Sequence, residues 1–266
     1  MSDQLVQLDV RDRVAYLTLN RPDKRNAFNA AVIEQLDRGL DEVMDREDIR
    51  ALVLRGNGPC FCAGADLEEM AELGNASEEE NLAKANGLAD CLHRLYTLPV
   101  PTVACVHGAA YGGGLGLVAC ADVALSYGDT TFALSEVRLG LIPAVISPYV
   151  LRAMGTRQAK RYMITGESFD GSRAHELGLV HEVIRDGEQM SERRASVVGS
   201  LRKNGPGAMK KVKELCHDFS ERRIDPEVVE ETARRIARTR TEEEAREGVE
   251  AFLEQRTPQW IKEDVQ

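Results

Sequence analysis

The sequence predicts an α/β fold in which a core of mostly parallel strands is followed by an α-helical C-terminal region. Two observations support this prediction. Before Ser191, apolar runs of strand length alternate with segments of helical spacing, an order typical of parallel sheets. From Ser191 to Gln266 the chain is charged and has only helical patterns. Because this region has no evident core of its own, we expect it to pack on the main core or on a neighbouring subunit.

The N-terminal part predicts a strand followed by a helix. The strand is the apolar run from Val14 to Asn20, which ends at the turn-forming Arg21-Pro22-Asp23. Asn29 is the predicted N-cap of the helix. Apolar residues on one face of this helix are Val32, Ile33, Leu36, Leu40, Val43 and Met44. The intervening Lys24 and Arg25 are either solvated surface charges or contacts to a phosphate.

A second strand, Ala51 to Gly56, is followed by a glycine-bearing segment and a helix. Gly64 permits a backbone conformation that other residues resist, and the helix is predicted to begin near Asp66. Such a unit can direct amides at a ligand, because the first four N–H groups of a helix have no intrahelical partner. The polar stretch from Gly74 to Lys84 is predicted to be a mobile surface segment, and Leu88 to Leu98 a helix.

The central stretch from Val103 to Pro143 is the main candidate for function. An apolar strand ends at Gly108, and the three glycines from Gly112 to Gly114 open a helix, so this is a second strand, glycine and helix unit. Amides at such a helix start favour an anion or a developing oxyanion. Glu136 lies in an otherwise apolar stretch, where desolvation raises the pKa of a carboxyl towards neutrality. It is therefore a candidate general acid/base.

The remaining segments are mostly helical in pattern. One helix is predicted from Met154 to Ile164 and a shorter one from Ser172 to Leu177, with Gly178 just past its end. Further helical patterns in the C-terminal region cover Met209 to Leu215, Pro226 to Ala237 and Thr241 to Arg256.

Composition narrows the class of protein. Of the 266 residues, 43% are hydrophobic and 29% charged, as in ordinary globular proteins. No apolar run approaches the roughly 18 residues that span a bilayer, and the N-terminus has no signal pattern, so we expect a cytoplasmic protein without a membrane partner. A net charge of −10 argues against non-specific nucleic-acid binding.

The spacing of cysteines and histidines gives no indication of a metal site. The six cysteines match no zinc or redox motif and are expected to be reduced and mostly buried.

Gly114-x-Gly116-x-x-Ala119 matches a dinucleotide fingerprint, but the true motif turns directly off its strand, whereas here the match begins six positions after Gly108.

Five ordered motifs together resemble the crotonase, or enoyl-CoA hydratase/isomerase, superfamily. They are NRPDKRNAF, GPCFCAGADLEEM, VHGAAYGGGLGL, FALSEVRLGLIP and AHELGLVHEV. The resemblance implies a crotonase-like spiral of β-β-α units over residues 1–200, followed by a helical oligomerisation region over residues 201–266. It also implies an acyl-CoA substrate, no separate cofactor, and a homotrimer or a dimer of trimers.

The resemblance assigns roles to individual residues. The backbone N–H groups of Ala65 and Gly113 would hold the thioester oxygen, and Glu136 would transfer protons. Residues implied in binding CoA and the acyl group are Lys24, Arg25, Ala27, Ala63, Asp66, Leu67 and Gly112. The family often adds a C-terminal lysine to the CoA site; here Ile261 stands at that place and Lys262 follows it.

One departure from the family pattern concerns the acid/base residues. Hydratases with two glutamates carry one of them two positions after the triple glycine, where this chain has Gly116, and the other at the place of Glu136. The segment from Ser135 to Gly155 is similar to bacterial methylglutaconyl-CoA hydratases, which favours hydration of a short or branched 2-enoyl-CoA, with or without a distal carboxylate. The alternatives are a single-glutamate Δ3-Δ2-enoyl-CoA isomerase, other crotonase chemistry, and a non-catalytic acyl-CoA-binding subunit.

Four further side chains are weaker candidates for the same site. Arg138 and Arg152 could meet a substrate carboxylate, although surface or interface charge is the favoured interpretation of both. Tyr111 and Tyr149 are candidates for assisting the chemistry.

Overall fold

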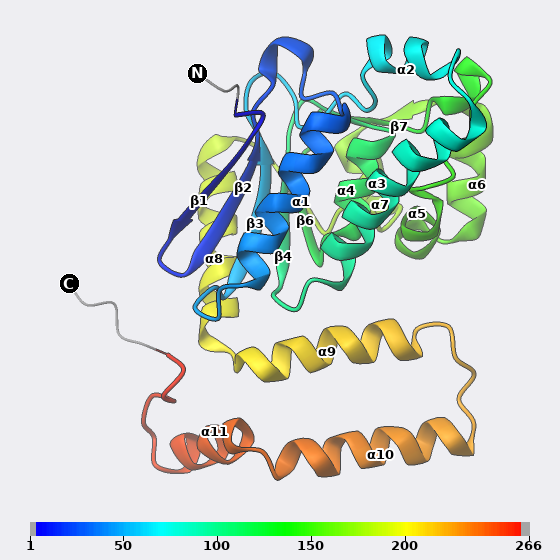
Figure 1. Cartoon of the computed structure of the whole chain (residues 1–266). Helices are drawn as coiled ribbons and strands as arrows, with labels where there is room; N and C mark the ends of the chain where they lie inside the picture. Colours follow the sequence, from blue (N-terminus) through cyan, green and yellow to red (C-terminus); the bar gives the residue numbers. More distant parts are fainter. Residues whose placement is uncertain (1–3, 262–266) are drawn as a thin grey trace.

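The computed structural model describes residues 4–261 and contains two β-sheets with helices around them (Figure 1). The larger sheet has the strand order β1-β2-β3-β4-β6-β9, in which only the β1–β2 pair is antiparallel. Its strands are β1 Val6–Arg11, β2 Val14–Leu19, β3 Ala51–Gly56, β4 Thr102–Val106, β6 Val123–Tyr127 and β9 Glu182–Ile184. The smaller sheet has the order β5-β7-β8, with β5 Ala109–Tyr111, β7 Thr131–Ala133 and β8 Ser168–Phe169.

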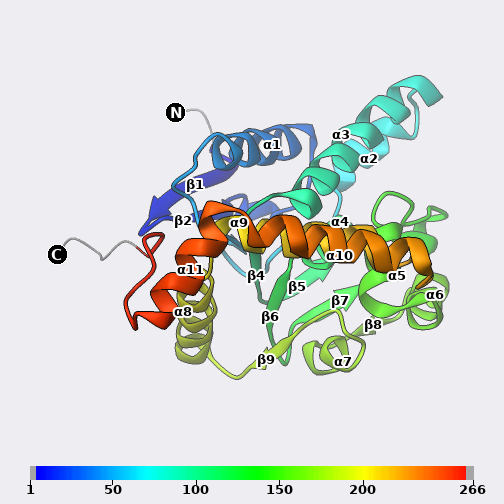
Figure 2. The same ribbon diagram turned by 90° about the horizontal axis from the view of Figure 1, so that it is seen from below.

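Helices cover both faces of the larger sheet, which explains why its central strands are almost continuously apolar. On one face lie α1 (Ala30–Met44), α3 (Glu78–Thr97) and α4 (Gly113–Cys120), within the larger hydrophobic cluster. On the other face α8 (Gly187–Lys203) packs against β3 and β4 in a second cluster (Figure 2). The shorter helices are η1 Pro22–Lys24, α2 Leu67–Leu73, η2 Glu136–Leu139, α5 Ser147–Met154, α6 Thr156–Thr165 and α7 Gly171–Glu176.

The last three helices form a separate layer beneath the core (Figure 1). They are α9 Pro206–Phe219, α10 Pro226–Arg240 and α11 Glu243–Leu253. The Nζ atom of Lys213 on α9 lies 2.7 Å from Oδ2 of Asp122, and the indole N–H of Trp260 donates to the carbonyl of Lys203 at 3.0 Å. These contacts attach the helical layer to the core. No helix within residues 4–261 has the length and apolar character needed to cross a membrane.

The structure confirms most of the predicted elements. Asn29 caps α1 by accepting a hydrogen bond from the N–H of Val32 at 3.0 Å, as predicted. The three C-terminal helical patterns correspond to α9, α10 and α11. All six cysteines are free thiols, and only Cys216 is exposed. Strand β1 was missed by the sequence analysis.

Two predicted boundaries are wrong. Most of the stretch from Gly74 to Lys84 is not an irregular surface segment, because α3 already begins at Glu78. Ser77 and Glu80 form a capping box: each residue's side chain accepts from the other's backbone N–H, at 2.8 and 3.2 Å. The helix predicted from Met154 to Ile164 is also wrong at its start, since α5 ends at Met154 and α6 follows after Gly155.

Candidate active site

Three chain segments that are distant in sequence meet at the upper edge of the core. They are the segment after β3 around residues 61–66, the turn from β5 into α4, and the start of η2. Cys62 pairs with Ala110 of β5 in an isolated parallel bridge, donating to the carbonyl of Ala109 at 3.0 Å and accepting from the N–H of Tyr111 at 3.0 Å. The first two segments are thereby held side by side.

The amide of Ala65 has a fixed direction but no acceptor of its own. Phe28 donates to the carbonyl of Gly64 at 2.7 Å and accepts from the N–H of Asp66 at 2.7 Å. Because successive backbone groups of an extended segment point to opposite sides, the N–H of Ala65 points away from the Phe28 backbone. It donates to none of the residues that the structure describes, and Ala65 itself is exposed.

Gly64 allows the two segments to approach this closely. Its φ of +92° belongs to the region that favours glycine, and a Cβ atom there would lie 3.1 Å from the carbonyl oxygen of Tyr111. A larger residue would therefore be strained at this position and would push β5 away from the Ala65 amide.

The second amide, that of Gly113, is the first N–H of α4 and so lacks an intrahelical acceptor. Gly112 precedes it with φ +46° and ψ −117°, which turns the chain sharply from β5 into the helix. A Cβ atom at Gly113 would lie 2.9 Å from the ring of Phe28, the residue that pairs with Ala65. Phe28 therefore contacts both of the segments that carry the sequence-predicted donors.

Glu136 is placed against the same turn. A Cβ atom at Gly112 would lie 2.9 Å from Oε1 of Glu136, so the carboxyl packs directly on the backbone that opens α4. The backbone carbonyl of Glu136 accepts from the N–H of Leu141 at 3.0 Å, which fixes the first residue of η2. Oε2 is buried and has no hydrogen-bond partner within the described part of the chain. Burial raises the pKa of Glu136, and its own backbone N–H opposes that rise only in part.

The place of a second carboxylate is filled by hydrocarbon. Gly116 is buried in α4, and a Cβ atom there would lie 2.4 Å from Cγ2 of Ile146 and 3.7 Å from Cδ1 of Leu92. The sequence analysis did not identify Ile146, because a contact across thirty positions has no local sequence signal. The surroundings of position 116 are therefore apolar.

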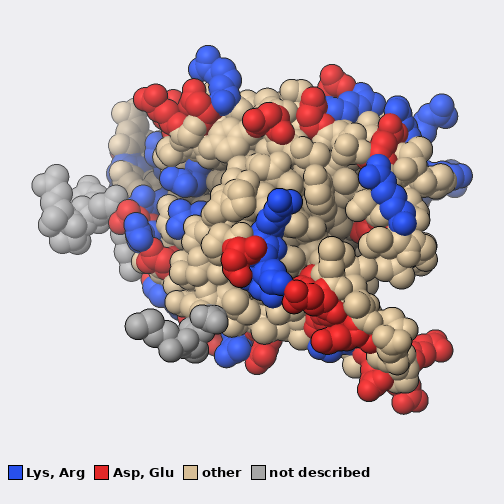
Figure 3. Space-filling view, turned by 90° about the horizontal axis from the view of Figure 1, so that it is seen from above, with Lys and Arg blue, Asp and Glu red and all other residues tan. Residues whose placement is uncertain are grey.

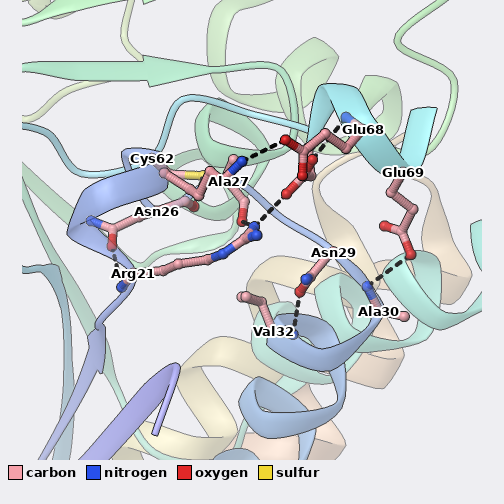
Figure 4. Close-up of polar contacts among 11 residues, drawn as sticks. Arg21, Asn26, Ala27, Asn29, Ala30, Val32, Cys62, Glu68 and Glu69 are labelled. Atoms are coloured by element: carbon pink, nitrogen blue, oxygen red, sulfur yellow. Dashed lines mark hydrogen bonds and ion pairs between the residues drawn. The ribbon is translucent and has the colours of Figure 1, made fainter. Parts of the chain in front are cut away.

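Apart from Gly112, which precedes α4, the residues predicted to bind CoA and the acyl group lie in two segments: η1 with the loop after it, which contains Ala27 (Figure 4), and residues 63–67. The N–H of Ala63 donates to the carbonyl of Arg25 at 2.9 Å, which joins the two segments. Lys24 forms an ion pair with Glu68 at 2.7 Å, consistent with the adjacent basic and acidic side chains on the upper face (Figure 3). Arg25 is exposed and Ala27 is buried.

Asp66 and Leu67 differ in what they offer a ligand. The carboxylate of Asp66 is already engaged, since it binds Arg21 at 2.5 Å and accepts from the N–H of Glu68 at 2.9 Å. Leu67, at the start of α2, is 71% exposed and presents an apolar surface at the edge of the site.

The weaker candidates for the site differ in the contacts that their side chains already make. Arg152 is paired with Glu221 at 3.1 Å, and Tyr149 packs edge-on against Tyr96 with ring centroids 5.2 Å apart. Arg138 is exposed beside Gly166 and forms no ion pair with residues 4–261. Of the two arginines, only Arg138 is available to a substrate anion.

Sequence reasoning missed two polar residues in this region, the partly buried Arg21 and the buried Asn26. Asn26 is 1% exposed; its side chain donates to the carbonyls of Asn57 at 2.8 Å and Cys60 at 2.9 Å. It also accepts from the N–H of Arg21 at 2.8 Å. The turn-forming Arg-Pro sequence was the available signal, but it indicated only a loop.

Comparisons with known proteins find similar chains over nearly the whole length. A model described as enoyl-CoA hydratase/isomerase matches residues 9–263. The crystal structure of an enoyl-CoA hydratase from Shewanella pealeana is 42% identical, with a TM-score of 0.93 and coverage of 96% of each chain. The 2,3-dehydroadipyl-CoA hydratase of Escherichia coli is 32% identical over 250 residues, 93% of this chain and 95% of the relative. The mevalonyl-coenzyme A hydratase of Aspergillus fumigatus is 32% identical over 253 residues, 93% of this chain and 91% of the relative.

Proposed function

Because this chain belongs to the enoyl-CoA hydratase/isomerase family, we propose that it adds water across the 2,3 double bond of an acyl-CoA through a single acid/base, Glu136. Family membership also confirms the predicted crotonase-like α/β fold and implies an acyl-CoA substrate. The observation that supports the proposal most directly is the placement of Glu136: its Oε1 packs on the Gly112 turn that opens α4, and its Oε2 is buried without a hydrogen-bond partner in the described part of the chain.

In the proposed reaction the two amides stabilise negative charge on the thioester oxygen, and the carboxylate transfers protons. The thioester oxygen accepts from the N–H groups of Ala65 and Gly113, which need no reorganisation as negative charge develops on it. Water attacks Cβ while Glu136 takes its proton, and the π electrons move onto the thioester oxygen as an enolate. The enolate then collapses and Glu136 returns the proton to Cα, so that one water is added and the carboxylate is regenerated.

Isomerisation is the second candidate, favoured by the hydrocarbon that occupies the site of a second glutamate. With a single carboxylate in apolar surroundings, the same group can remove a proton from one carbon and return it to another. In that case Glu136 moves a proton between Cα and Cγ of a 3-enoyl-CoA and no water is added.

Separate incubations with a 2-enoyl-CoA and with a 3-enoyl-CoA distinguish these functions by their products. We expect a 2-enoyl-CoA to yield 3-hydroxyacyl-CoA with the mass of one added water, measured by liquid chromatography and mass spectrometry. An isomerase would form no hydroxyacyl product from either ester and would convert 3-enoyl-CoA to 2-enoyl-CoA. Binding of both esters without any product would support the non-catalytic alternative and would exclude hydration.

For the acyl group we propose a short or branched chain, with methylglutaconyl-CoA as the type of substrate. The relatives named for 2,3-dehydroadipyl-CoA and mevalonyl-CoA act on polar acyl groups, the first of them dicarboxylic. Arg138, two positions after Glu136, is a cation without an ion pair to residues 4–261. A panel of straight, branched and dicarboxylic 2-enoyl-CoA esters tests this proposal, and equal kcat/KM for all of them would contradict it.

The activity should fall on the acid side at a pH set by Glu136. The charged carboxylate must accept the proton of water, and burial raises the pKa of Glu136 above the usual 4.5. We therefore expect the acid limb of kcat/KM to have its midpoint above pH 4.5, while acyl-CoA affinity in the Glu136→Gln variant stays constant over the same range. A midpoint at or below the ordinary glutamate value would contradict this assignment.

We also propose that residues 201–266 serve assembly into a trimer or a dimer of trimers. Large apolar side chains of this region are exposed, with Val212 at 56%, Ile236 at 50% and Phe252 at 82%. A cavity of about 740 Å³ between α9 and α10 is lined partly by Val212 and Ile236. Ile261 stands at the place of the family's C-terminal lysine, and Lys262, which follows it, lies outside the described residues.

A further inference from the structure

An ion pair joins Arg21, labelled in Figure 4, to Asp66, the residue that follows Ala65 in the chain. The Nη1 atom of Arg21 is 2.5 Å from Oδ2 of Asp66, and the two side chains are only 15% and 7% exposed. The same nitrogen donates to the carbonyl of Ala27 at 3.2 Å. One guanidinium thus links the loop predicted to bind CoA with the turn that contains Ala65.

The Asp66 carboxylate holds the turn from the other side. Its second oxygen accepts from the N–H of Glu68 at 2.9 Å, which caps α2. Its hydrogen bond to Arg21 is the main cause that lowers the pKa of Asp66, so the carboxylate is charged at neutral pH. Asp66 is consequently fixed at its backbone N–H by Phe28 and at both carboxylate oxygens.

Arg21 is itself held at its backbone. Its N–H donates to Oδ1 of Asn26 at 2.8 Å, and its carbonyl accepts from the N–H of Asn26 at 2.8 Å. Pro22 follows and limits the conformations open to Arg21. The side chain therefore extends from a rigid base, as a supporting residue for a catalytic group must.

We propose that Arg21 is a positioning residue: by holding Asp66, the next residue in the chain, it keeps the Ala65 N–H in the direction that the Phe28 hydrogen bonds give it. This inference rests on the proposed function, in which that N–H stabilises the thioester oxygen. A small rotation of the Ala65 peptide would lengthen its hydrogen bond to the oxyanion without moving the CoA loop far. Misplacement of a catalytic group by about 1 Å can reduce a rate about 100-fold.

The test compares Arg21→Gln with Arg21→Lys. Glutamine keeps a polar side chain but lacks the charge and the planar, forked guanidinium group of arginine. We therefore expect kcat to fall about 10- to 100-fold, with KM changing less than threefold. Lysine can pair with Asp66 but lacks the planar fork, so it should recover part of kcat. Arg46→Gln, which removes an exposed ion pair to Asp48 at 2.9 Å, is the matched control and should leave kcat unchanged.

The infrared stretch of a bound thioester carbonyl gives a direct measure of amide placement. A 2-enoyl-CoA with a ¹³C-labelled carbonyl is bound to Glu136→Gln, which prevents turnover, with and without Arg21→Gln. In Glu136→Gln alone the stretch should shift to lower frequency than in the free ester, and the added Arg21→Gln change should reverse part of that shift. If the stretch stays the same in both variants, or kcat is retained in Arg21→Gln, Arg21 has no positioning role.

Two further outcomes are informative. If the bound ester in Glu136→Gln shows no shift from the free ester, the amides do not polarise the carbonyl, and the proposed function fails together with this inference. If Arg21→Gln does not fold, as judged by circular dichroism, Arg21→Lys takes its place in both measurements. The inference is then overturned if Arg21→Lys and Asp66→Asn both keep the wild-type kcat and both leave the carbonyl stretch at its frequency in Glu136→Gln alone. A lower kcat or a smaller shift of the stretch in either variant supports the inference.

Discussion

Glu136→Gln should bind acyl-CoA with wild-type affinity and turn it over at least about 1,000-fold more slowly. General acid–base groups contribute about 10²- to 10⁴-fold, and no second carboxylate shares the task, because hydrocarbon from Ile146 fills its place. Glutamine keeps the size of the side chain but cannot take a proton from water. Initial rates of 3-hydroxyacyl-CoA formation and calorimetric binding of a saturated acyl-CoA measure the two quantities separately.

The same variant should be at least as stable as the wild type at pH 7. The pKa of Glu136 is raised in the folded state, so its stabilising contribution is present below the unfolded pKa and is lost as pH rises through the folded value. At neutral pH the buried charge therefore opposes folding, and glutamine removes it. The difference in melting temperature should shrink as pH approaches 4. Glu176→Gln, which removes a carboxylate from an exposed ion pair with Arg173, is the matched control for the stability measurement. For the rate measurement, turnover at the wild-type level in Glu136→Gln would contradict the proposed mechanism.

The parts of the site that the sequence predicted are those with a local signal. The glycines around Gly64 and Gly112 indicated close backbone approach, and the structure shows positive φ at both. Glu136 could be singled out because one carboxylate in an apolar stretch is unusual. In each case the physical requirement acts on the residue itself or on its immediate neighbours.

The parts that it missed depend on tertiary contacts. Arg21 was assigned to a turn, since nothing nearby shows that its side chain reaches Asp66, which lies 45 positions away. The start of α3 was missed because the polar residues after Ser77 gave no apolar face, although their capping box starts a helix. Strand β1 is half exposed along most of its length, so its apolar pattern is weak.

Gly116→Glu should unfold the active site rather than restore a second catalytic carboxylate. Its Cβ would lie 2.4 Å from Cγ2 of Ile146, so the side chain cannot enter without displacing a packed residue. Overpacking typically costs about 1–3 kcal/mol, and a buried carboxylate without a partner adds to that cost. We expect the free energy of unfolding to fall by about 3 kcal/mol or more, measured by urea denaturation.

A control variant, Gly199→Glu, and a double variant show whether contact with Ile146 causes the loss of stability in Gly116→Glu. Gly199 lies within α8, and a Cβ atom there would have no neighbour within 4 Å, so this control should be neutral or stabilising, since glycine is a poor helix former. Ile146→Ala alone should cost about 2–5 kcal/mol because it leaves a cavity. In Gly116→Glu/Ile146→Ala the glutamate occupies that space, so the combined loss should be smaller than the sum of the two single losses by about 1 kcal/mol or more. Strict additivity would mean that Ile146 is not the residue that excludes a glutamate from position 116.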